Sequence, residues 1–422
     1  MSAHYWLFGG SIVALGTPAQ AAAWLPRVEA LTMRGCFALT ELGHGSNARG
    51  LLGRYARVDA AGAYTRDAPS PDALFGVMMG ALSGRRVGIA AVAVRQARVA
   101  LAIAVRYGLL RRAFAGAPGA AETLLLYYPM HRRRLLPRLA ITVVHQVVLN
   151  ALKAGWSRSL GAKDCPVSSC GYRPQAVMTW HGLETMQVAR EACGGQEFKR
   201  ENRIGVSRAA QDISATFEGD ITVLFQQVAK ACLAAYARGA KAGGRFDGAL
   251  AHLNHPPAPP PPVASVAFAV HALRRAEAGL PPRLVQSIAS SAAAPGVTPF
   301  DAFTAHQVAA DAVARVHTQL LLLDAFTAAT GAGGTAPASL GPLLGALDTL
   351  HALAVVEASG GVLLRGGALS PADAAAAHDV VDELCAALRP RAAELAGVMA
   401  VPDFLLAPIA LDVVAHNSRA RP

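Results

Sequence analysis

Segments able to form β-strands are nearly missing from this sequence. The alternating runs of valine, isoleucine, threonine and tyrosine that mark a half-buried sheet are scarce throughout. Hydrophobic residues nevertheless make up 53% of the 422 residues, and much of that share is alanine, whereas aromatic residues make up only 6%. Alanine is the strongest helix former and allows helices to approach closely. The sequence therefore predicts a mostly α-helical fold made of helical bundles.

Apolar residues at helical spacing locate the expected helices. They cover residues 2–31 with a break at Pro18, 72–115 with Gly84 as a candidate break, 122–153, 174–192, 220–238, 264–278, 300–330, 340–359 and 371–399. Glycines concentrate between residues 32 and 64, which predicts loops with at most one short strand near Gly35–Leu39. The run Asn-His-Pro-Pro-Ala-Pro-Pro-Pro-Pro at 254–262 is typical of an extended spacer and predicts a domain boundary.

The chain is strongly basic, with a formal net charge of +11 and a pI of about 9.8. Nucleic acid is the first partner that such a charge suggests. The arginines, however, are spread along apolar helical stretches, and neither a zinc finger nor an aromatic RNA-binding pattern occurs. We therefore expect no nucleic-acid partner; a phosphorylated ligand or a solvated basic face accounts for the same charge.

The N-terminal segment and the cysteines bear on the compartment. Tyr5–Gly16 is mostly apolar and Ala19–Ala21 resembles a signal-peptidase site, but no basic residue precedes the segment. Gly9, Gly10 and Pro18 would also make a poor membrane span, so we expect a buried helix and no membrane span.

None of the six cysteines forms a Cys-x-x-Cys pair, and no second ligand pair sits at zinc spacing. Reduced thiols and no metal site are expected.

Three local patterns each allow a binding role and an ordinary one. Residues 36–47, around Thr40, are rich in glycine and hydroxyl groups, which suits either contact with a planar polar ring or a surface turn. Arg111 and Arg112, followed by Arg132–Arg134, suit a pyrophosphate or a solvated helix end. Gly194 and Gly195 suit a helix C-cap or the close approach of a ligand to the backbone. They do not form a dinucleotide-binding fingerprint, since no strand precedes them.

A fourth pattern, Thr216–Val223, carries the candidate catalytic carboxylate. Asp220 is a plausible N-cap for a helix whose buried stripe would include Leu224, Val228 and Ala231. Glu218 would then lie on a glycine-containing turn beside Phe217, an apolar neighbour that raises the pKa of a carboxyl group and makes it a better base. An ordinary exposed glutamate at a helix start is the alternative.

Taken in order, these patterns resemble the acyl-CoA oxidases of peroxisomal β-oxidation, most closely the plant and algal branch. The resemblance rests on His4–Gly10, Thr40–Asn47, Ala192–Gly195 with Glu201–Arg203, Phe217–Asp220, and Pro402-Asp403 with Ala407–Ile409. It implies FAD as cofactor, fatty acyl-CoA and O2 as substrates, a homodimer, and a peroxisomal location. Thr40 would contact the flavin ring, Arg111 the FAD pyrophosphate of the neighbouring subunit, and Gly194 and Gly195 the flavin across the dimer interface. Glu218 would remove the α-proton of the thioester.

The resemblance also implies a division of the chain. Residues 1–34 would be the remnant of an N-terminal helical domain, 35–83 a vestigial β region, and 84–253 a four-helix-type bundle on the flavin and dimer side. Residues 254–262 would be the linker and 263–422 a second helical domain. The C-terminal Ser418–Pro422 is not a Ser-Lys-Leu-type signal, so the peroxisomal location follows from the resemblance alone.

One departure from the family affects the expected activity. Family members place a full β-barrel domain between the Thr40 loop and the helix that follows Leu82, whereas here only Arg54–Ser83 fills that space. The barrel supplies one wall of the flavin site, so we expect FAD to bind weakly or not at all and Glu218 to stay solvated. The alternative function is therefore a non-catalytic partner subunit of a full-length oxidase; a gene model lacking exons would give the same sequence.

Overall fold

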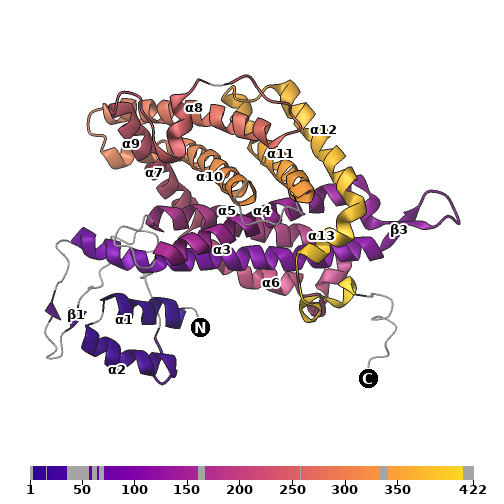
Figure 1. Cartoon of the computed structure of the whole chain (residues 1–422), viewed down its shortest axis with the longest axis horizontal. Helices are drawn as coiled ribbons and strands as arrows, with labels where there is room; N and C mark the ends of the chain where they lie inside the picture. Colours follow the sequence, from indigo (N-terminus) through magenta and orange to yellow (C-terminus); the bar gives the residue numbers. More distant parts are fainter. Residues whose placement is uncertain are drawn as a thin grey trace.

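The computed structural model describes residues 3–15, 17–35, 57–58, 64–65, 71–159, 167–256, 258–331 and 341–411. The described chain is predominantly helical, as predicted (Figure 1). Its helices are α1 (Gly10–Leu15), α2 (Pro18–Glu29), α3 (Pro71–Leu110), α4 (Pro129–Ser159), α5 (Val167–Ala192), α6 (Ile204–Gln211), α7 (Ile221–Lys241), α8 (Val266–Ala292), α9 (Pro299–Thr304), α10 (Gln307–Thr330), α11 (Gly341–Arg365), α12 (Pro371–Leu388) and α13 (Ala392–Val398). Two antiparallel pairs of short strands complete the described elements: β1 (Arg57–Val58) with β2 (Tyr64–Thr65), and β3 (Arg112–Ala115) with β4 (Glu122–Leu124).

The helices form two layers, with α3 along the length of the lower one. Figure 1 shows α3–α6 below and α8–α12 above, with α1 and α2 beneath one end of α3 and the β3–β4 hairpin projecting beyond the other. Thr17 is the N-cap of α2 and Pro18 is the first residue of that helix. A new helix therefore begins at Pro18, where the sequence predicted a break. The strand predicted near Gly35–Leu39 falls almost entirely outside the described residues, as does most of the 35–83 region.

Several predicted helix boundaries were wrong: α5 begins at Val167 instead of residue 174, α8 extends to Ala292 instead of 278, and two boundaries fail at the β3–β4 hairpin. Helix α3 is continuous through Gly84, and it ends at Leu110 instead of Ala115 because the β3–β4 hairpin begins at Arg112. The predicted helix over 122–153 also started too early. Glu122–Leu124 pairs with β3, and α4 begins at Pro129, where a proline is tolerated in the first turn.

Small side chains allow α3 and α5 to pack closely. A stripe of buried alanines at a spacing of three and four residues runs along α3; it comprises Ala90, Ala93, Ala97, Ala100 and Ala104. From α5, Gly182 faces this stripe so closely that an added Cβ would lie 2.9 Å from the carbonyl oxygen of Ala93. Gly182 of α5 lies against Ala93 of α3, and Cys193, just beyond α5, lies close enough to Tyr107 of α3 to interact with it electrostatically. Because the residue numbers rise together along the two helices, α5 runs parallel to α3.

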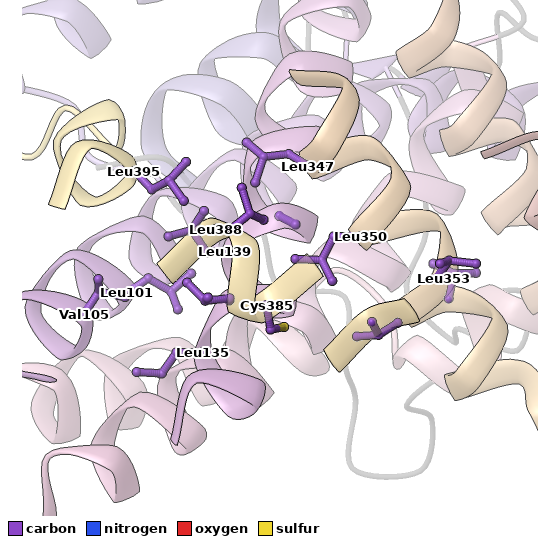
Figure 2. Close-up of a cluster of buried hydrophobic side chains, with 14 of the residues drawn as sticks. Leu101, Val105, Leu135, Leu139, Leu347, Leu350, Leu353, Cys385, Leu388 and Leu395 are labelled. Carbon is purple, nitrogen blue, oxygen red and sulfur yellow. The ribbon is translucent and has the colours of Figure 1, made fainter. Parts of the chain in front are cut away.

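A single large core connects the regions on either side of the proline-rich segment. The largest cluster of buried residues draws members both from the range Ala100–Ile204 and from the range Phe268–Ala410. Figure 2 shows part of it, where leucines of α3, α4, α11 and α12 surround Cys385. Arg98 of α3 also donates a hydrogen bond of 2.9 Å to the carbonyl oxygen of Met399. The two predicted helical domains therefore share their interior.

Three helical segments are long and apolar enough to span a membrane by length and composition alone. They are Arg85–Leu110, Pro129–Gly155 and Gly341–Arg365, and in each at least half of the most apolar window is buried inside the protein. Packing against other helices thus accounts for much of their hydrophobicity. The expected lack of a membrane span stays a prediction.

Candidate functional site

The turn that carries Glu218 is built as the sequence predicts. Asp220 caps α7, its side chain accepting hydrogen bonds from the backbone N–H groups of Thr222 at 2.8 Å and Val223 at 3.2 Å. Gly219 adopts a φ of +114°, a conformation that side-chain-bearing residues rarely occupy. The cap and the glycine together fix the direction in which Glu218 leaves the turn.

Glu218 is enclosed, not solvated, and the expectation that it would stay hydrated was wrong. Only 3% of its side chain is exposed, and Arg85 Nε lies 2.8 Å from its Oε1 atom. Arg86 donates weaker hydrogen bonds to the backbone carbonyl of Glu218, and the guanidinium of Arg85 also lies over the ring of Phe217. Burial raises the pKa of Glu218, while Arg85 and Arg86 pull the pKa in the opposite direction. Arg85 and Arg86 of α3 therefore occupy the place around Glu218 where we had expected solvent.

The second carboxylate oxygen of Glu218 has a different environment. Its Oε2 atom is buried and has no hydrogen-bond partner among the described residues. An ionised oxygen in such a position is costly unless a proton or a donor reaches it. This atom is therefore the part of Glu218 that is available to take up a proton.

The other predicted binding residues gather at the opposite end of α3. Arg111 follows the last residue of the helix and is exposed, and Gly194 and Gly195 are exposed just beyond the end of α5. Gly194 has a φ of +60°, and a Cβ added at either glycine would meet nothing within 4 Å. The backbone is thus open to an incoming group on this side.

A basic cavity of about 440 Å³ adjoins these glycines. It is lined by Arg190, Glu197, Phe198, Lys199, Arg200, Arg203, Gly205 and Val206. Glu197 is buried, and the loss of hydration raises the pKa of its carboxyl group to about 7, partly offset by hydrogen bonds from the backbone of Gly205 and Ile204. Four cationic side chains around one partly protonated carboxyl group favour an anionic ligand.

The structure does not bring Glu218 and Arg111 together within one chain. Arg86, which contacts Glu218, and Leu110, which precedes Arg111, both belong to α3. At a rise of 1.5 Å per residue, the helix separates them by about 36 Å. No side chain spans that distance. Thr40, the fifth predicted site residue, lies outside the described residues.

Sequence reasoning missed several residues of these sites. Arg85 was not singled out, because nothing local indicates that it pairs with a carboxylate far along the chain. Three histidines were also missed: His145, His181 and His351 are buried and line a second cavity of about 650 Å³ between α4, α5, α10 and α11. Burial lowers the pKa of His181 to about 3, so its imidazole is neutral at physiological pH. Single histidines on apolar helices gave no signal of this gathering.

The arrangement of these helices matches the fold of solved acyl-CoA oxidase structures. The structure superposes on acyl-CoA oxidase 1 of Yarrowia lipolytica with a TM-score of 0.84 at 24% identity, covering 97% of this chain and 77% of that one. A Caenorhabditis elegans acyl-CoA oxidase-2 structure, described as bound with FAD, ascaroside-CoA and ATP, matches with a TM-score of 0.83 at 17% identity and coverages of 99% and 78%. At these identities the likeness establishes the fold.

Sequence comparison identifies the family. The family model described as "Acyl-CoA oxidase, C-alpha1 domain" matches residues 79–233, and the one described as "Acyl-CoA oxidase" matches residues 266–409. The peroxisomal acyl-coenzyme A oxidase 3 of Arabidopsis thaliana is 30% identical over 525 aligned positions, covering 98% of this chain and 77% of that protein. The chain belongs to the acyl-CoA oxidase family.

The chain is shorter than its relatives. A second Arabidopsis thaliana relative, peroxisomal acyl-coenzyme A oxidase 3.2, is 35% identical over 377 residues, which cover 87% of this chain but only 55% of that protein. The alignment with oxidase 3 is longer than the 422-residue chain itself, so more than a hundred of its 525 positions are gaps in this chain. This length difference agrees with the short segment found between Thr40 and α3.

Proposed function

We propose that this chain is an FAD-dependent acyl-CoA oxidase that acts in the peroxisome as a homodimer. The reaction converts a fatty acyl-CoA and O2 into the trans-2-enoyl-CoA and H2O2. The observation that carries the dimeric site is the separation of about 36 Å along α3 between the Glu218 end and the Arg111 end, taken at 1.5 Å per helical residue. A second copy, related by a twofold axis, would bring the Arg111 end of one subunit to the Glu218 end of the other.

Glu218 is proposed to remove the α-proton of the acyl thioester. Its burial raises its pKa, which makes the ionised carboxylate a stronger base than a solvated glutamate. Arg85 holds one oxygen and keeps the group ionised, while the unpartnered Oε2 atom is left to accept the proton. Arg85 thus positions the base.

The residues at the open end fit the phosphate part of FAD. Arg111 would hold the pyrophosphate, the exposed backbone at Gly194 and Gly195 would allow the flavin to lie close, and Thr40 would contact the flavin ring. The neighbouring cationic cavity adds positive potential for such an anion. FAD, when bound, supplies the acceptor for the two electrons of the desaturation and passes them to O2.

A complementation experiment tests the shared site. Glu218→Gln and Arg111→Ala would each be inactive alone, measured as acyl-CoA-dependent H2O2 release with added FAD. In a mixed preparation half of the dimers are heterodimers with one intact site each, so about a quarter of the parent activity should return if the dimer is symmetric. No recovery in verified heterodimers would show that both residues serve a site within one subunit, contradicting the proposal.

The second candidate function is a non-catalytic partner of a full-length oxidase. Two observations favour it: the chain spans about half of the length of one of its relatives, and Arg85 already occupies one oxygen of Glu218. In that case the purified chain would carry little flavin. The absorbance spectrum of the chain, alone and after reconstitution with FAD, separates the two functions, because only an oxidase gains a stoichiometric yellow cofactor that acyl-CoA bleaches.

A further inference from the structure

Four potential metal ligands converge where α7, α8 and α10 meet. Cys232 of α7, Glu277 of α8 and His317 of α10 are all buried, and one ligand atom from each lies within 4.8 Å of the others. His252, on the short helical turn Gly248–Asn254, places its Nε2 atom 3.3 Å from Glu277 Oε2. Figure 1 shows α7, α8 and α10 at the same end of the molecule, away from the β3 hairpin.

The polar atoms of this cluster are only partly satisfied. His317 Nδ1 and Glu277 Oε1 are 2.6 Å apart and hydrogen-bonded, which fixes the orientation of both side chains. Three buried atoms form no hydrogen bond with the described residues: His317 Nε2, Glu277 Oε2 and His252 Nε2, of which the last two face each other at 3.3 Å. Three lone-pair donors gathered in an apolar interior are expensive unless something compensates them.

We propose that these four side chains bind one zinc ion. Thiolate, imidazole and carboxylate are the ligands that Zn²⁺ takes in proteins, usually four of them in a tetrahedron. With bonds of about 2.0 to 2.3 Å, neighbouring ligand atoms in a tetrahedron lie about 3.5 Å apart. The ligand atoms of Cys232, Glu277 and His317, now up to 4.8 Å apart, thus need a closure of roughly 1 Å, which small side-chain rotations provide. His252 reaches this group through its contact with Glu277 Oε2.

The charges of such a site also balance. Zinc binding removes the proton of the Cys232 thiol, so the thiolate and the Glu277 carboxylate together cancel the charge of the ion, and both histidines bind as neutral imidazoles. A neutral complex suits its surroundings, since Leu250, Leu284 and Val313 belong to the same apolar cluster as Cys232.

The position of the site gives it a structural role. Cys232 and His252 precede the proline-rich segment 254–262, whereas Glu277 and His317 follow it. A bound ion would therefore fasten the two sides of this segment to each other. This role is independent of the oxidase function, because the site lies on α7, α8 and α10 and contains none of the residues assigned to catalysis.

Metal titration of the full chain tests the proposal. After chelator treatment, we expect one equivalent of Zn²⁺ per chain to bind and to raise the thermal midpoint by several degrees. Co²⁺ substituted for zinc should show a thiolate-to-cobalt charge-transfer band. Binding well below one equivalent, or no change in the thermal midpoint, would overturn the proposal.

Variants identify the ligands. Cys232→Ser should abolish the charge-transfer band and weaken zinc binding at least tenfold. His252→Asn should weaken zinc binding without lowering the thermal midpoint of the metal-free protein, because the side chain of His252 is the most exposed of the four. Cys385→Ser is the matched control, because Cys385 is also a buried cysteine but lies within the leucine cluster of Figure 2. This substitution should leave the charge-transfer band unchanged. A Cys232→Ser protein that folds and binds zinc like the parent would refute the site.

Discussion

The two ends of α3 differ in almost every physical respect. At one end Glu218 is buried, ion-paired to Arg85 and located on a turn that requires a glycine at position 219. At the other, Arg111, Gly194 and Gly195 are exposed beside a basic cavity. The contrast shows that a buried, ion-paired carboxylate and an open basic surface lie at opposite ends of one long helix. Each end is incomplete alone, which is the physical reason for expecting a second subunit.

The largest effect is expected at the closed end. Arg85→Met would leave the carboxylate of Glu218 buried without its partner, which should lower the free energy of unfolding by about 3 to 5 kcal/mol near pH 7. Because burial already raises the pKa of Glu218, this penalty belongs to its ionised form. The loss should therefore shrink as the pH falls and the group becomes protonated. Urea unfolding at several pH values measures both quantities.

The double variant Arg85→Met/Glu218→Gln provides the control for that experiment. Removing the charge together with its partner should restore most of the lost stability. If the single and double variants are equally unstable, the loss comes from packing of the Arg85 side chain, and the ion pair does not contribute to the free energy of unfolding.

At the open end, Glu197 should make stability depend on pH. Its pKa is raised from 4.5 to about 7, so the folded state favours the protonated form. The corresponding stability is fully present below pH 4.5 and is lost as the pH rises to about 7, on the order of 3 kcal/mol in total. Glu197→Gln should accordingly be more stable than the parent at pH 8 and not at pH 4. The neighbouring exposed Glu201, changed to Gln, should follow the parent curve; similar behaviour of both variants would rule out Glu197 as the source.

Between the ends, Gly182 fixes how α3 and α5 lie against each other. Gly182→Ala places a Cβ 2.9 Å from the Ala93 carbonyl oxygen, so the helices must separate slightly. We expect a loss of about 1 to 3 kcal/mol in the free energy of unfolding. Gly155→Ala in α4, where an added Cβ meets nothing within 4 Å, is the control and should stabilise by about 0.5 to 1 kcal/mol. Equal effects of the two substitutions would mean that α3 and α5 can separate at Gly182 without a loss in the free energy of unfolding.

The smallest effect on stability is expected from Arg111. It is exposed, so Arg111→Ala should change the free energy of unfolding by less than about 0.5 kcal/mol. Its effect should appear in FAD binding instead, as a weaker affinity measured by flavin fluorescence titration. A destabilised Arg111→Ala protein would show that the open end has a structural function, and the contrast between the ends would weaken.

Local sequence determined some of these features and could not determine others. The Asp220 cap and the glycine turn at 219 depend on a few neighbouring residues, and the sequence predicted them correctly. The burial of Glu218 depends on Arg85 and Arg86, which reach it only after α4, α5 and α6 have folded back along α3. The β3–β4 hairpin was taken for helix because its residues carry little strand preference. Cys232, His252, Glu277 and His317 are likewise scattered over several elements, so no spacing rule could join them.

The shared core has a consequence for the nascent chain. Arg98 meets Met399 across a separation of 301 residues, and α3 is covered by α13 and the segment that follows it. At a synthesis rate of about 5 to 20 residues per second, roughly 15 to 60 s pass between the emergence of these two partners. During that interval α4 and α5 can already pack against α3, but the part of this apolar helix that α13 and the following segment later cover stays exposed. We therefore expect the growing polypeptide to depend on chaperones at the ribosome, and expression to be more sensitive to translation rate than the stability of the finished protein would suggest.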